Sequence, residues 1–137
     1  MKINAIDVWT VVVPTIPGRV HSPEWVSETS WDQVPKHIVR LRTDSELVGL
    51  GETGRGVPIG EVRAGGSLLL GKDPEIIALQ DIYGIGCEDV QRVGTGPAYD
   101  AFEMALCDLV GKMRGIPVHA LLGGAVRNRV RADYWMG

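Results

Sequence analysis

The chain has 137 residues, of which 45% are apolar and 23% are charged, and its formal net charge at pH 7 is −3. This composition is typical of globular proteins and excludes collagen-like and wholly disordered chains. The length supports one hydrophobic core but excludes a complete (β/α)8 barrel, which needs roughly 200 residues or more.

The distribution of charged and apolar residues argues against two classes of partner. No block of Lys and Arg occurs, so we expect no nucleic acid partner. The longest apolar stretch, around Leu68–Leu70, is too short to cross a bilayer, and the N-terminus lacks the features of a signal peptide. Cys87 and Cys107 lie in no CxxC or His-rich context, which favours a reduced, cytoplasmic protein without disulfides or structural zinc.

The first part of the chain predicts three strands. Residues 2–13 are rich in β-branched side chains that alternate with other types, and Pro14 ends this strand. Residues 37–43 and 47–52 are joined by the short turn Asp44–Glu46, which makes them an antiparallel hairpin. Residues 15–35 have no clear period, and a loop of this length in a small domain is either mobile or functional.

The second part of the chain predicts helices. In the clearest one, from Pro97 to about Arg114, apolar residues recur at three- and four-residue steps, and Gly115 follows as a left-handed cap. Asp108 and Lys112 form an i,i+4 pair on its solvent side.

Weaker patterns predict the remaining elements. A helix begins near Ile59, although Gly65-Gly66 weaken it, and Asp73-Pro74 open another helix that runs through Tyr83. Residues 118–122 form a short apolar turn, and residues 129–136 alternate weakly, as in a strand. Strands followed by helices predict an α+β fold, in which a three-stranded antiparallel sheet carries helices on one face.

Familiar catalytic motifs are missing from the sequence. It contains no HExxH, GxSxG, P-loop or EF-hand pattern, and His21, His37 and His119 are scattered. The series Gly54, Gly56 and Gly60 is a loose version of a dinucleotide fingerprint. We favour a flexible loop, because the preceding strand belongs to a hairpin and Pro58 lacks the N–H that a phosphate cradle would use.

One group of residues carries more chemistry. Two predicted loops hold cations and aromatic rings: Arg19, His21, Trp25, Trp31 and Arg55. These side chains suit the wall of an anion pocket. The tryptophans equally suit a role in packing the long loop onto the sheet, and the sequence leaves both readings open.

Two stretches resemble a known family. Val48-Gly49-Leu50-Gly51-Glu52-Thr53 closes the hairpin, and the helix that begins at Ala98 continues to Leu121-Leu122-Gly123-Gly124. Together they resemble the N-terminal capping domain of the enolase superfamily, in the mandelate racemase/muconate lactonizing enzyme branch. The resemblance extends over nearly the whole chain.

The resemblance implies a fold and a reaction. In such enzymes an α+β capping domain accompanies a (β/α)8 barrel, which holds Mg²⁺ and stabilises an enediolate formed when a proton leaves the carbon next to a carboxylate. Residues 1–125 then form the capping, substrate-specificity domain, and residues 126–137 begin a barrel whose catalytic groups and metal ligands lie outside this chain. The expected enzyme is a homo-oligomeric racemase, dehydratase or cycloisomerase, acting on a small carboxylate such as an acid sugar or hydroxy acid.

The resemblance also implies site residues. The capping domain closes two loops over the barrel, and they correspond here to the segments Arg19–Trp31 and Glu52–Pro58. Six residues are therefore expected to face substrate: Arg19, His21, Trp25, Trp31, Glu52 and Arg55. The chain alone, without catalytic residues or metal ligands, is expected to be inactive.

One departure and one rival interpretation accompany the resemblance. The turn Asp44–Glu46 lacks the glycine usual in the family, so a non-glycine residue is expected to adopt a positive φ. The rival is a stand-alone α+β interaction module that binds a partner through residues 116–137. The apolar side chains of that stretch would otherwise be exposed and favour association.

Overall fold

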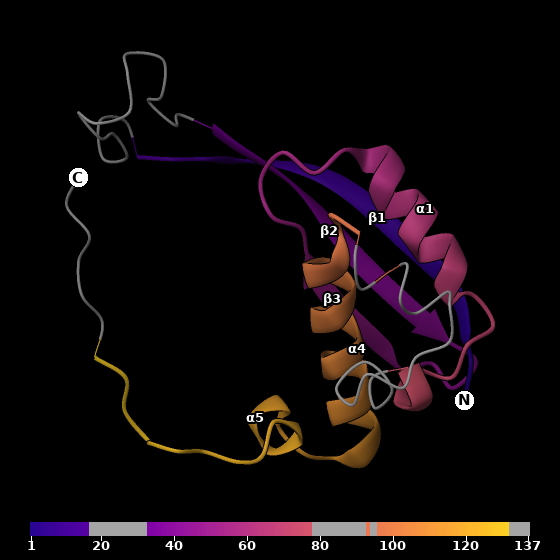
Figure 1. Ribbon diagram of the computed structural model, residues 1–137, viewed down its shortest axis with the longest axis vertical. Helices are drawn as coiled ribbons and strands as arrows, with labels where there is room; N and C mark the ends of the chain where they lie inside the picture. The colour runs from indigo at the N-terminus through magenta and orange to yellow at the C-terminus, as the bar shows by residue number, and fades with distance from the viewer. Residues whose placement is uncertain (17–32, 78–92, 94–95, 132–137) are drawn as a thin grey trace.

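Three antiparallel strands, in the order β1-β2-β3, form the sheet of the computed structural model (Figure 1). The structure describes residues 1–16, 33–77, 93 and 96–131. The strands are β1 (Ile3–Pro14), β2 (Gln33–Thr43) and β3 (Val48–Glu52). The predicted antiparallel hairpin is confirmed, since Arg40 of β2 pairs with Leu50 of β3.

Strand β2 begins at Gln33 rather than at His37, so the long loop is shorter than predicted. Pro35, which the sequence suggested as part of the loop, pairs with Val12 of β1. The pairing of β2 with β3 covers only residues 38–42 of β2, so Pro35 has a strand neighbour on one side. A proline without an N–H is tolerated at such an edge position.

The β2–β3 turn has the expected backbone conformation. Glu46 has a φ of 65° and is the one non-glycine residue with positive φ in the described part of the chain. Thr43 stabilises the turn, because its hydroxyl group donates to the carbonyl oxygen of Leu47 at 3.0 Å.

Two longer helices cover one face of the sheet (Figure 1). Helix α1 (Ile59–Leu69) contacts β1, and α4 (Tyr99–Arg114) lies against β3 and β2. The side chains between these layers form the core, which includes Ile3, Val39, Leu41, Val62, Leu69, Phe102, Ala105 and Leu109. The predicted α+β fold with helices on one face is confirmed.

Helix α4 approaches β3 so closely that β3 has room only for glycine. A Cβ atom built on Gly49 would lie 2.0 Å from the carbonyl oxygen of Ala105, and one on Gly51 would lie 2.0 Å from that of Ala101. The small side chains of Ala101 and Ala105 are fully buried at this contact. Glycine on the strand and alanine on the helix together allow the two backbones to approach each other.

Glycine also explains the packing of α1. The predicted weak point, Gly65-Gly66, lies within the continuous helix α1. A Cβ atom on Gly65 would lie 2.9 Å from Phe102 of α4, and one on Gly66 would lie 3.4 Å from Ile6. The loss of helix propensity is therefore accompanied by close packing of α1 on α4 and β1.

The outer edge of β3 is bound by two side chains of α4. Asp108 accepts the backbone N–H of Leu50 at 2.9 Å, and the ammonium group of Lys112 donates to the carbonyl oxygen of Val48 at 2.9 Å. The predicted i,i+4 pair between Asp108 and Lys112 is present at 2.6 Å. The pair thus links the helix to the strand in addition to stabilising the helix.

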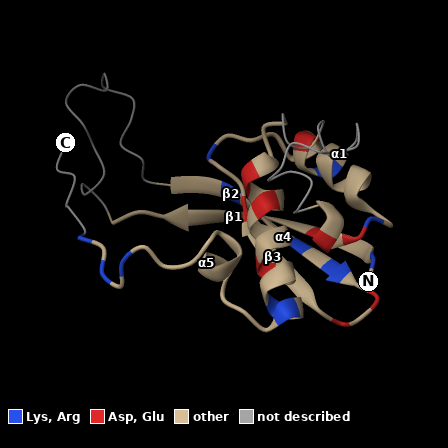
Figure 2. Ribbon diagram, turned by 60° about the horizontal axis from the view of Figure 1, so that its bottom comes forward, with Lys and Arg blue, Asp and Glu red and all other residues tan. Residues whose placement is uncertain are grey.

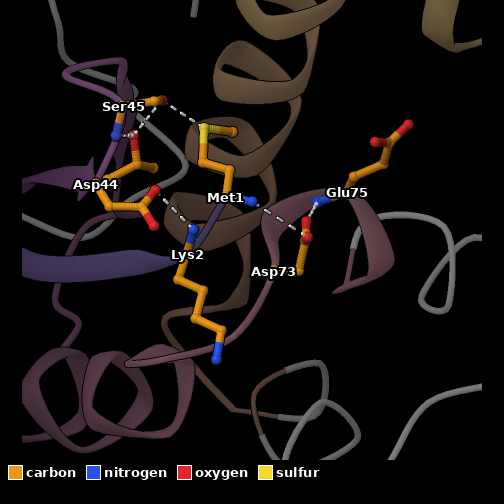
Figure 3. A network of polar contacts seen from close by, with 7 residues as sticks. Met1, Lys2, Asp44, Ser45, Asp73 and Glu75 are labelled. Carbon is orange, nitrogen blue, oxygen red and sulfur yellow. Dashed lines mark hydrogen bonds and ion pairs between the residues drawn. The ribbon is translucent and has the colours of Figure 1, made fainter.

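Polar contacts fix the start of β1 (Figure 3). The backbone N–H of Lys2 donates to Asp44 Oδ1 at 3.0 Å, and the N-terminal ammonium group lies 3.7 Å from Asp73 Oδ2. Asp73 also accepts the N–H of Glu75 at 3.0 Å, as expected of an N-cap residue, and residues 74–77 are helical. The remainder of that predicted helix lies outside the described residues.

The chain leaves the sheet after α4. Gly115 has a φ of 65° and ends α4 in the predicted left-handed conformation, and the short helix α5 (Val118–Leu121) follows. Residues 122–131 form neither helix nor strand, and they carry basic but no acidic residues (Figure 2). The strand expected over residues 129–136 is not formed at 129–131, where no neighbouring strand offers hydrogen bonds, and residues 132–136 lie outside the described part.

Candidate functional site

The two segments expected to face substrate start from the same end of the sheet (Figure 1). In an antiparallel sheet the last residues of β1 and β3 and the first residues of β2 point the same way, and Pro14 pairs with Gln33 at the tip. The segment 53–58 follows β3 at this end. Strands β1 and β2 extend past Glu52, the last residue of β3, by five residues each, or about 17 Å of strand.

Glu52, the last residue of β3, is paired with Lys36 of β2. The ammonium nitrogen of Lys36 lies 2.5 Å from Glu52 Oε1, and both side chains reach solvent. Because Gly51 faces α4, the alternation of a strand directs Glu52 to the open face of the sheet, opposite the helices. Lys36 therefore partly neutralises Glu52 in this conformation.

Thr53 connects the end of β3 to β2. Its backbone N–H donates to the carbonyl oxygen of His37 at 2.9 Å, and its hydroxyl oxygen accepts the N–H of His37 at 3.0 Å. Thr53 is fully buried. The segment that follows thus starts from a rigid, doubly hydrogen-bonded residue.

The imidazole ring of His37 contacts the same segment further along. Its Nε2 lies 2.9 Å from the carbonyl oxygen of Val57, and its Nδ1 lies 3.0 Å from the hydroxyl oxygen of Thr10 in β1. The register explains this position, because Thr10 and His37 are paired residues of the sheet.

Arg55 lies in the turn of this segment and is exposed. Gly56, which follows, has a φ of 78°, a conformation that glycine adopts without strain. The positive charge of Arg55 therefore lies near the end of the sheet at which β1 ends and β2 begins.

Of the six expected site residues, the structure describes Glu52 and Arg55, which lie on one short segment. The other four, Arg19, His21, Trp25 and Trp31, lie outside the described residues, so their convergence on Arg55 stays a prediction. The sequence analysis did not single out His37, Thr10, Thr53 or Lys36 as site residues. The observation that brings Thr10 and His37 together is the register of β1 with β2, and residue spacing alone does not define that register.

The open face of the sheet carries a charged cluster beside Glu52. Arg40 Nε donates to Asp7 Oδ2 at 2.9 Å and thereby holds the pKa of Asp7 below its usual value, with Arg42 contributing a further positive charge. The guanidinium carbon of Arg40 also lies 4.8 Å from the ring centroid of Trp9, a cation–π distance.

Two kinds of feature are absent from the part of the chain that the structure describes. In residues 1–16, 33–77, 93 and 96–131, no group of three or more His, Cys, Asp and Glu side chains is placed to hold a metal ion. Within the same ranges, none of the helices combines the length and the hydropathy that spanning a membrane requires.

Comparison with known proteins identifies the family. The model of the mandelate racemase / muconate lactonizing enzyme N-terminal domain matches residues 6–123, which is most of the chain. The chain belongs to this family. Solved members share the fold of this N-terminal domain: a putative mandelate racemase/muconate lactonizing enzyme from Roseovarius nubinhibens has a TM-score of 0.72 at 24% identity, over 95% of this chain and 36% of that one.

Several curated relatives of this N-terminal domain are named D-galactonate dehydratase. D-galactonate dehydratases from Pectobacterium atrosepticum and Klebsiella pneumoniae are 34% and 33% identical to it, over 73% and 80% of the chain. An enolase from Thermobispora bispora, solved with magnesium and formate, has a TM-score of 0.65 at 29% identity and is matched over 93% of this chain and 33% of its own. The chain spans 28% and 30% of the two curated relatives.

Proposed function

We propose that this chain is the capping, substrate-specificity part of a Mg²⁺-dependent acid-sugar dehydratase or related enzyme of the enolase superfamily. The observation that carries the proposal is the family match over residues 6–123, together with relatives named D-galactonate dehydratase. Residues 1–125 then form the capping domain and residues 126–137 the start of the barrel, and the complete enzyme is a cytoplasmic homo-oligomer.

The Mg²⁺ ion does not fit the described residues of this chain. Mg²⁺ needs converging carboxylates, and the described part contains no group of three or more His, Cys, Asp and Glu side chains so placed. The proposal therefore assigns the ion and the acid–base groups to the barrel. In support, the enolase from Thermobispora bispora is complexed with magnesium and with formate, a small carboxylate. The ion would stabilise negative charge on the substrate carboxylate.

The chain's own contribution is to recognise the anion and to exclude water. Arg55 would bind the substrate carboxylate or hydroxyl groups, and Glu52 would accept hydrogen bonds from sugar hydroxyls once the substrate competes with Lys36. On the long loop, Arg19 and His21 would add positive charge, and Trp25 and Trp31 would shape the pocket. Closure over the substrate would strengthen these interactions, because water is expelled.

An apolar hollow on α4 supports the presence of a barrel. It has a volume of about 310 Å³ and is lined by Glu103, Met104, Cys107, Val118 and Leu122. We propose that the barrel covers this surface in the complete enzyme. An exposed apolar surface of this kind marks an interaction site.

The test uses the complete enzyme that carries this chain. We expect D-galactonate or a related acid sugar to be dehydrated in the presence of Mg²⁺ and not after chelation, and the 137-residue chain to be inactive. Arg55→Gln should raise KM for the anionic substrate about tenfold, the loss of one charge-assisted contact. Arg63→Gln on the exposed side of α1 is the matched control and should leave KM unchanged. Turnover by the isolated chain, or an unchanged KM for every substrate in Arg55→Gln, would contradict the proposal.

A further inference from the structure

In the segment 53–58, Thr53 is fully buried and Val57 packs against the hydrophobic core, whereas the two glycines between them are open to solvent space. A Cβ atom built on Gly54 or Gly56 would meet no heavy atom within 4 Å, so the middle of the segment borders open space. Its two ends are held, by the Thr53 hydrogen bonds at the start and by the carbonyl oxygen of Pro58, which accepts from Glu61 N–H at 3.0 Å. Between these ends, the Val57 side chain packs on the core, and the hydrogen bond from His37 to the carbonyl of Val57 adds a directional link to the sheet.

The partners of the ring define its tautomer. The carbonyl oxygen of Val57 can only accept, so the contact at 2.9 Å requires a proton on Nε2. In the neutral ring Nδ1 is then an acceptor, and the hydroxyl group of Thr10 donates to it at 3.0 Å. Each ring nitrogen has a hydrogen-bond partner, so these contacts define one orientation and one tautomer of the neutral ring.

We propose that His37 is a positioning residue that holds the segment Glu52–Pro58, and with it Arg55, in its substrate-facing conformation through the Nε2–H bond to Val57. Thr10 orients the ring from β1, and the backbone of His37 fixes Thr53. A single residue of β2 thereby determines both the start and the later course of the segment. The substrate-facing part of this statement rests on the proposed function, whereas the hold on the segment does not.

The first experiment measures the ring itself in the 137-residue chain. Nitrogen-15 NMR of the imidazole, recorded at a pH at which the ring is neutral, should give His37 a pyrrole-type shift at Nε2 and a pyridine-type shift at Nδ1. His119, which is exposed, serves as the internal reference for a ring free to sample both tautomers. The opposite tautomer at His37, or a mixture like that of His119, would overturn the proposal.

The second experiment uses two substitutions that each keep one half of the ring's function. Gln extends about as far as Nε2 and can donate to Val57, whereas Asn extends only as far as Nδ1 and cannot. Arg55 is exposed, and trypsin cuts after it faster once the segment detaches from the sheet, so the rate of cleavage after Arg55 reports how firmly the segment is held. We expect His37→Asn to raise this rate about tenfold, the loss of one hydrogen bond, and His37→Gln to stay within about twofold of the wild type.

Thermal unfolding of the variants separates local from global effects. Equal melting temperatures with a raised cleavage rate in His37→Asn alone would support the proposal, and equal rates in both variants would overturn it. In the complete enzyme, His37→Asn should raise KM more than it lowers kcat, and His37→Gln should restore KM. An unchanged KM in an active enzyme would refute the substrate-facing role. An enzyme inactive on acid sugars would refute the proposed function, and the NMR and cleavage results would still decide the positioning role.

Discussion

Glu46 carries backbone strain that a single substitution should relieve. Its φ of 65° lies in the left-handed region, which costs an L-residue about 1 kcal/mol or more. Glu46→Gly should raise the free energy of unfolding by about 0.5 kcal/mol, because the greater freedom of glycine in the unfolded chain offsets part of the gain. Urea denaturation measures this difference. Glu46→Ala is the control, since it removes the same side chain but keeps the strain, and an equal gain there would contradict the explanation.

Asp7 should make folding stability depend on pH in the acid range. Arg40 lowers the pKa of Asp7 in the folded state, so below the usual pKa near 3.8 the unfolded chain binds more protons. The stabilisation is fully present above about pH 4 and is lost as the pH falls through the lower folded value. We expect Asp7→Asn to reduce stability at pH 7 by less than about 1 kcal/mol, because the pair is partly exposed.

The measurement is urea denaturation of both proteins from pH 7 to pH 2. The difference between wild type and Asp7→Asn should shrink toward zero at the acid end. Glu103→Gln on α4 is the control, because the described residues offer Glu103 no ion pair, and it should show a smaller difference. A difference that is independent of pH would contradict the assignment.

Residues differ in how far the sequence alone predicts them. The positive φ of Glu46 followed from a three-residue turn without glycine, since any such turn forces one residue into that region. The contacts of His37 could not be predicted from the sequence in this way. They depend on the register that pairs Thr10 with His37 and on the path of the chain after Thr53, and neither is written in local residue spacing.

The contact between β3 and α4 provides the sharpest test at the scale of elements. Gly49→Ala or Gly51→Ala would place a methyl carbon 2.0 Å from a helix carbonyl oxygen, so the helix must move away from the strand. We expect each substitution to lower the free energy of unfolding by about 3 kcal/mol, measured by urea denaturation. Gly54→Ala is the matched control in open space and should change it by less than about 1 kcal/mol. Equal effects at Gly51 and Gly54 would refute close packing.

The sequence predicted which helices and strands exist better than it predicted the residues at which they begin and end. The three-to-four-residue period of α4 and its Gly115 cap defined that helix nearly to the residue, because the burial pattern repeats over four turns. The start of β2 was wrong, because Pro35 is a strand breaker only where both edges are paired. The glycines of α1 predicted weakness in isolation, and their contacts with Phe102 and Ile6 appear only once α4 and β1 are in place.

At the scale of the whole molecule, the chain after α4 exposes apolar surface. The exposed fractions are 66% for Leu122, 93% for Val126 and 81% for Val130. We expect the purified chain to associate reversibly as its concentration rises and to bind a hydrophobic dye, as seen by gel filtration and fluorescence. Leu122→Ser should weaken both effects, whereas Leu50→Ser on the sheet face should not. A monomer without dye binding would contradict this expectation and would favour neither a barrel partner nor an interaction module.

The fold class was accessible from the sequence, whereas the convergence of the candidate site residues was not. Alternation followed by helical periodicity indicates an α+β layer, because each pattern buries one face. Whether Arg19 and the tryptophans of the long loop approach Arg55 depends on tertiary contacts of residues outside the described ranges. The answer depends on the path of the chain between β1 and β2, which amino-acid composition does not determine.

The two hydrogen bonds from Asp108 and Lys112 to the outer edge of β3 limit where a further strand can be added to this sheet. Both peptide groups that an incoming strand would first engage there, the N–H of Leu50 and the C=O of Val48, are already occupied by side chains. A strand edge without such protection can pair with strands of other molecules, which leads to aggregation or to the exchange of segments. Helix α4 therefore blocks the addition of a further strand along β3, and a strand recruited from another polypeptide has to join elsewhere, along β1 or along the part of β2 that extends past β3.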